Sequence, residues 1–133
     1  MQIIYSFLAA GVTFSLLDYV WLAKVAKNFY LEKLAPFVSI KDGSLVVNYA
    51  GAVIFYILAL VATYIFAVRV STSTFQAFYM GATLGFFMYA FYDFTNYATL
   101  KNWPLSLTLV DIAWGTFLMS CVSAVMYYVL NLK

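Results

Sequence analysis

Three aspartates lie inside long apolar stretches of the sequence, where a carboxyl group is costly. They are Asp18, Asp93 and Asp111. A charged side chain at the centre of a membrane-spanning helix costs about 2.5 to 3.5 kcal/mol on insertion scales, so each one needs a partner or a function. Carboxylates that lie close together repel each other, and such a group would hold at least one proton, a cation or an amine. The chemistry that these residues allow is therefore proton exchange or the binding of a cationic group.

Each aspartate has a hydrogen-bonding side chain three residues further along. Trp21 follows Asp18, Trp114 follows Asp111, and Asn96 follows Asp93. Residues three apart share a helical face, so an indole N–H could donate to a carboxylate, or its ring could form the wall of a pocket. The repeated spacing predicts three similar polar positions, one on each of three helices.

The sequence has no histidine and a single cysteine, Cys121. The usual ligands of zinc and haem and the usual general base at neutral pH are therefore missing, and we predict no metal site. Carboxylates and carbonyls could hold magnesium or manganese, but not a typical zinc set; the sequence leaves the cofactor unknown. Seven basic residues are scattered without a run, which argues against binding to nucleic acid.

The composition predicts an integral membrane protein. Hydrophobic residues make up 66% of the chain and charged residues only 9%, whereas soluble domains carry roughly 25% charged residues. Four helical spans of about 20 residues each use nearly all of the 133 residues. The expected fold is all-α: one transmembrane domain over residues 1–133, a four-helix bundle with an interfacial amphipathic segment after the first span.

Hydropathy and helix-end signals place the spans at about 3–23, 45–68, 75–98 and 105–130. The first stretch lacks the cationic leader and cleavage site of a signal peptide, so we expect a retained span. Ser73 and Gln76 have the spacing of a capping box before the third span, and Pro104 precedes the fourth. Residues 24–44 alternate charged and apolar side chains up to Pro36, which is typical of a segment in the membrane interface. A turn is expected at 41–44.

Basic residues are unevenly divided between the two ends of this bundle. Connections one and three carry five, namely Lys24, Lys27, Lys33, Lys41 and Lys101; the opposite end has Arg69 and Lys133. The positive-inside rule then predicts that connections one and three face the cytoplasm and that both termini lie outside.

Helix direction brings the three aspartates to a common depth. Spans one and three run toward the end from which span four returns, so all three carboxyls fall roughly 7 to 10 Å inside the cytoplasmic boundary, at 1.5 Å per residue. In span three, residues 81, 85, 89, 93 and 97 recur every four positions and form a small-residue edge that leads to the aspartate. The candidate ligand-binding residues are Asp18, Trp21, Asn48, Tyr89, Asp93, Asn96, Tyr97, Asp111 and Trp114. None is assigned a catalytic role.

A longer motif surrounds two of the aspartates. It reads YDFTNYATLKNW over residues 92–103 and DIAWG over residues 111–115. The chain resembles, over its whole length, the bacterial membrane family called domain of unknown function 2177. The resemblance implies a four-helix protein of the bacterial inner membrane and brings no activity with it.

Three functions remain open from the sequence. The leading hypothesis is a non-enzymatic membrane protein that binds, and in one version moves, a small cationic or protonatable ligand or a proton; transport would favour a homo-oligomer. The second is a membrane enzyme acting on a lipid-soluble substrate, and the third is an accessory subunit of a membrane complex. Tyrosines and tryptophans could instead form a slot for a flat or polyene-like ligand. The simplest alternative gives the aspartates no ligand: they snorkel, cap helices or pair with Lys24 and Lys101.

Overall fold

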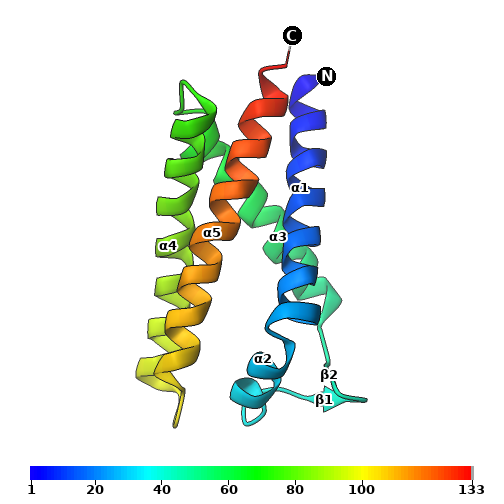
Figure 1. Ribbon diagram of the computed structural model, residues 1–133, viewed down its shortest axis with the longest axis vertical. Helices are drawn as coiled ribbons and strands as arrows, with labels where there is room; N and C mark the ends of the chain where they lie inside the picture. The colour runs from blue at the N-terminus through cyan, green and yellow to red at the C-terminus, as the bar shows by residue number, and fades with distance from the viewer. Residues whose placement is uncertain (133) are drawn as a thin grey trace.

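The structure, a computed structural model, describes residues 1–132 and confirms the all-α class (Figure 1). The helices are α1 (Gln2–Val20), α2 (Lys27–Leu34), α3 (Tyr49–Thr63), α4 (Thr74–Thr99) and α5 (Leu105–Leu130). Single π-helical turns extend α1 through Trp21–Val25 and α3 through Tyr64–Val68. A small antiparallel hairpin, β1 (Ile40–Lys41) and β2 (Ser44–Leu45), lies between α2 and α3.

Within residues 1–132, three helices are long and apolar enough to cross a membrane: Gln2–Val25, Tyr49–Val68 and Leu105–Leu130. α4 has the same 26-residue length as α5, but its tyrosines, threonines and amide side chains lower its mean hydropathy. A fourth span therefore stays a prediction from length and packing. Figure 1 shows α1, α4 and α5 side by side, with α3 crossing behind them at an angle, and both termini at one end. There Gln2 Nε2 donates to the Leu132 carbonyl at 2.9 Å.

Helix starts follow the capping chemistry of the sequence. Ser73 Oγ accepts the Gln76 N–H at 3.1 Å, as the capping box predicted. Asn48 caps α3 by accepting the Gly51 N–H at 3.1 Å. The second span therefore begins at Tyr49 rather than at Leu45, which belongs to β2.

The interfacial segment is a short helix followed by a hairpin. The chain leaves the π-helical turn at Ala26, where φ is −108° and ψ is 10°, and α2 then packs under the bundle. Asp42 and Gly43 have φ of 50° and 69°, the pair of positive φ values that a two-residue hairpin turn requires. The turn was predicted, but the two short strands beside it were not.

Glycines let α4 and α5 pack with their backbones close together. A Cβ added at Gly81 would meet the Met119 carbonyl and the Ser123 side chain, and one at Gly85 would meet the Gly115 carbonyl and Met119. The predicted small-residue edge of α4 therefore faces α5. This close approach fixes the two helices relative to each other over several turns.

α3 has buried residues only in its second half, where Ala59 and Thr63 are buried. Ala67 and Val68, in its final π-helical turn, are fully buried against α4 and α5. The preceding turns expose Val53, Ile57 and Leu58 by 56 to 62% of their surface. The first half of α3 thus leans away from the other helices and leaves gaps on both of its sides.

Candidate functional site

A cavity of about 230 Å³ lies between α1, α2, α4 and α5, at the end of the bundle that carries the hairpin. Asp18, Asp93 and Asp111 all contribute to its wall. The lining residues are Asp18, Leu22, Tyr30, Leu34, Leu45, Tyr89, Tyr92, Asp93, Trp103, Leu107, Asp111 and Trp114. Helix direction had predicted this convergence at one depth, and the cavity is aromatic as well as acidic.

Asp18 is the best-satisfied of the three carboxylates. Its Oδ1 accepts the Trp114 indole N–H at 3.1 Å, and its Oδ2 accepts the Tyr56 hydroxyl at 2.9 Å. Hydrogen bonds to a charged group contribute about 1.5 to 3 kcal/mol each. Asp18 therefore links α1 to both α3 and α5.

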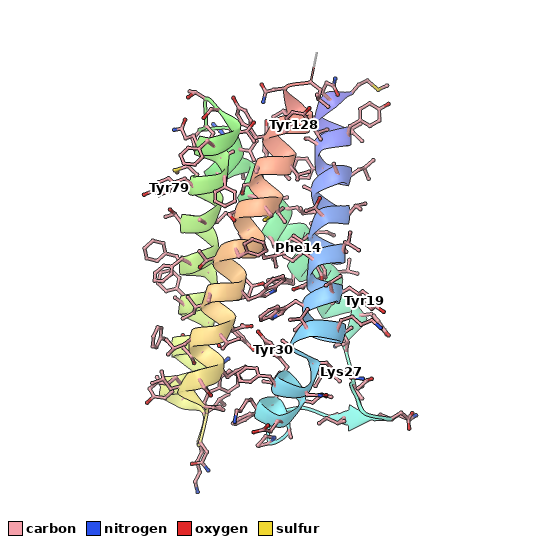
Figure 2. All side chains as sticks on the ribbon, in the orientation of Figure 1. Phe14, Tyr19, Lys27, Tyr30, Tyr79 and Tyr128 are labelled. Carbon is pink, nitrogen blue, oxygen red and sulfur yellow. The ribbon has the colours of Figure 1, made fainter. Side chains whose placement is uncertain are left out.

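Asp111 accepts a hydrogen bond from a tyrosine of α2. The Tyr30 hydroxyl donates to Asp111 Oδ1 at 2.5 Å and accepts the Trp21 indole N–H at 3.3 Å. Burial and the neighbouring Asp111 carboxylate raise the pKa of Tyr30 above its usual value, so its hydroxyl remains a donor throughout the neutral range. In Figure 2 the labelled Tyr30 lies between α2 and the lower part of α5.

The two tryptophans of the repeated motif stack on each other. Their ring centroids lie 4.5 Å apart and their planes differ by 4°. Trp114 donates to Asp18, and Trp21 donates to Tyr30, which in turn donates to Asp111. The stacked rings therefore connect the hydrogen bonds of the two aspartates. Both rings are thereby fixed at the edge of the cavity.

Asp93 differs from the other two aspartates. It is only 1% exposed, and neither of its carboxyl oxygens has a hydrogen-bond donor within residues 1–132. The carboxyl of Asp111 lies beside it and is itself an acceptor unless the two groups share a proton. Burying an unsatisfied carboxylate costs several kcal/mol, so this group requires a proton or a cation.

No cation of the described chain neutralises these carboxylates. In residues 1–132 the single ion pair is Lys33 with Glu32, at 2.8 Å on the surface. Lys24 and Lys101 therefore do not pair with the aspartates, contrary to the simplest alternative. The same residues contain no group of three or more histidine, cysteine or carboxylate side chains arranged to hold a metal ion.

Comparison with known proteins gives one result. The model of the predicted membrane protein family DUF2177 matches residues 3–128. The chain belongs to this family. Neither a curated protein nor a solved structure matches it. Since the match spans all three aspartates and the family description names no activity, the function of this DUF2177 protein has to be argued from its geometry.

The structure brings most of the predicted site residues together. Asp18, Tyr89, Asp93, Asp111 and Trp114 line the cavity, and Trp21 contacts it through Tyr30. Three others lie elsewhere, namely Asn48, Asn96 and Tyr97. Asn48 is used as a helix cap. Asn96 has a short side chain rotated about 60° from Asp93 around the helix. Tyr97, one turn beyond Asp93, is 49% exposed.

Sequence reasoning missed Tyr30, Tyr56 and Trp103 as site residues. Tyr30 lies in the segment interpreted as interfacial, and Trp103 in the connection before α5, where its indole N–H donates to Thr108 Oγ1 at 3.1 Å. Tyr30 is the one buried position of α2, and nothing in the sequence distinguishes it from its neighbours Phe29 and Leu31. Tyr56 lies in an apolar run with nothing to distinguish it from its neighbours.

Proposed function

We propose that this DUF2177 protein binds a small organic cation, an ammonium group, in the Asp18/Asp93/Asp111 cavity. The observation that carries the proposal is Asp93, which is buried, has no hydrogen-bond donor among residues 1–132 and lies next to a second carboxyl. Two adjacent carboxyls share a proton when the cavity holds no cation, and an ammonium group takes the place of that proton.

The walls of the cavity suit an ammonium group. Tyr30, Tyr89, Tyr92, Trp103 and Trp114 all line it, beside the three carboxylates. Aromatic faces attract cations, and cages of such rings bind quaternary ammonium groups. A volume of about 230 Å³ is below the range of roughly 300 to 1,000 Å³ that is usual for drug-sized ligands. The cavity therefore fits a head group rather than a large molecule.

Equilibrium binding of benzyltrimethylammonium tests the proposal. The protein is placed in nanodiscs of phosphatidylglycerol, whose head group carries no amine, and titrated at pH 7. We expect Asp93→Asn to weaken binding at least tenfold. The matched control is Asp42→Asn: Asp42 is exposed in the hairpin turn, and asparagine tolerates its positive φ.

Two results would count against an ammonium site. Either the probe fails to bind the unaltered protein, or Asp93→Asn and Asp42→Asn bind it equally well. In both cases the aspartates would serve helix packing, as expected for an accessory subunit.

The basic end of the bundle is proposed to face the cytoplasm of a bacterial inner membrane. Lys27, labelled in Figure 2, and the connection between α4 and α5, which carries Lys101, lie at the end opposite the termini (Figures 1 and 2). In a Cys121→Ser background, a cysteine at position 27 or 101 should stay unlabelled by an impermeant external thiol reagent in intact cells. Labelling at either position would reverse the orientation.

A further inference from the structure

An apolar groove adjoins the acidic cavity on the side of α3. It has a volume of about 630 Å³ and lies between α1, α2, β2 and α3. Asp18, Leu22, Tyr30 and Leu45 line both the groove and the cavity. The carboxylate of Asp18 therefore stands where the two spaces meet.

The groove is open to the surroundings of the bundle. Tyr19 and Phe55, which line it from α1 and α3, are 59% and 41% exposed. Figure 2 shows Tyr19 and Lys27 on the side of α1 and α2 that faces away from α5. In a membrane, this opening faces hydrocarbon next to the interface. A hydrocarbon chain could enter it without crossing water.

We infer that the ligand is an amphipathic ammonium compound, with its head in the Asp93/Asp111 cavity and its hydrocarbon tail in the α1/α3 groove. This inference rests on the proposed function and names the class of ligand. Charge complementarity fixes the direction of binding, because carboxylates line the cavity while the groove wall is mainly apolar. Among the basic residues of the described part of the chain, only Lys27 lines the groove, and none of them lines the cavity.

Photo-crosslinking locates the tail. The probe is decyltrimethylammonium with a diazirine at the tail end, in phosphatidylglycerol nanodiscs, and adducts are mapped by mass spectrometry. We expect adducts on α1 and α3 residues of the groove, reduced at least fivefold in Asp93→Asn and unchanged in Asp42→Asn. A decanol probe with the same diazirine should give no enrichment there. Ala52→Trp, which fills the groove, should move the adducts away while benzyltrimethylammonium still binds.

The outcomes separate the two proposals. If decanol labels the groove as strongly as the ammonium probe, or if ammonium adducts spread over the outer faces of α4 and α5, the tail site is wrong. In that case Asp93-dependent binding of benzyltrimethylammonium would still support the head-group site. If benzyltrimethylammonium does not bind, the head-group site itself fails.

Competition distinguishes two sources of the same ammonium chemistry. Displacement of the probe by lysophosphatidylethanolamine would identify a membrane lipid, whose phosphate could contact Lys27. Displacement by dodecylamine alone would identify a free alkylamine. Displacement by lysophosphatidylglycerol, which has no amine, would overturn the inference.

Discussion

The two sides of the bundle are packed in opposite ways. On one side, Gly81 and Gly85 let α4 lie against the backbone of α5, and no room is left for even one methyl group. On the other side, the first half of α3 leans outward and leaves an open groove against α1 and α2. The same short chain thus contains a tight interface, between α4 and α5, and a loose interface, between the first half of α3 and the helices α1 and α2.

This difference in packing explains how the carboxyls of the acidic cavity can be fixed in position while the cavity stays accessible to a ligand. Asp93 and Asp111 come from the tight α4/α5 pair, whose spacing the glycines set. Asp18 comes from α1 and contacts the loose helix through Tyr56. Two carboxyls are therefore held in place, while the third stands at the opening.

The largest expected effect on stability comes from placing a large side chain in the tight interface between α4 and α5. Gly85→Leu would press a side chain into the Gly115 carbonyl and Met119. We expect a loss of about 3 kcal/mol or more in the free energy of unfolding, at the upper end for overpacked cores. Thermal unfolding in detergent, followed by size-exclusion chromatography, measures it.

Gly11→Leu, at the loosely packed side of α1, is the matched control for Gly85→Leu. Gly11 faces an open groove beside α3, and an added Cβ meets only Leu60, at 3.5 Å. We expect a change within about 1 kcal/mol. Equal destabilisation by Gly85→Leu and Gly11→Leu would mean that the α4/α5 interface is no more tightly packed than the α1/α3 interface.

The next effect concerns the side-chain hydrogen bond between α3 and α1. Tyr56→Phe removes the hydroxyl that donates to Asp18. A hydrogen bond to a charged group is worth about 1.5 to 3 kcal/mol, and the melting temperature should fall accordingly. Tyr79→Phe is the control, since Tyr79 is 63% exposed on the outer face of α4 (Figure 2). No difference between the two variants would show that the Asp18 contact does not hold α3.

The smallest expected effect on stability is that of Asp93→Asn. Asp93 has no donor to lose within residues 1–132, and the new amide can donate to Asp111. We expect the free energy of unfolding to change by less than about 1 kcal/mol. Asp18→Asn, which disturbs two hydrogen bonds, should cost more. The reverse order, measured by thermal unfolding, would mean that Asp93 stabilises the fold and is not free for a ligand.

The sequence predicted the helices and the common level of the three aspartates along the bundle because both depend on local periodicity. The small-residue edge of α4 was predicted for the same reason. The lean of α3 and the fold of α2 under the cavity could not be predicted, since they depend on contacts between distant segments. Tyr30 and Tyr56 illustrate this, because their partners are 81 and 38 residues away. Asn48 was misplaced because a capping residue and a polar residue inside a span look alike in an apolar sequence.

Infrared difference spectroscopy tests the central claim most directly, because it observes the carboxyl groups themselves. Spectra of the protein in phosphatidylglycerol nanodiscs at pH 7 are compared before and after addition of benzyltrimethylammonium. The account predicts a protonated-carboxyl band without the cation and its loss when the cation binds. Asp93→Asn should remove this response, and Asp42→Asn should retain it. Binding of the cation with no change in any carboxyl band, or an unchanged response in Asp93→Asn, would contradict the account.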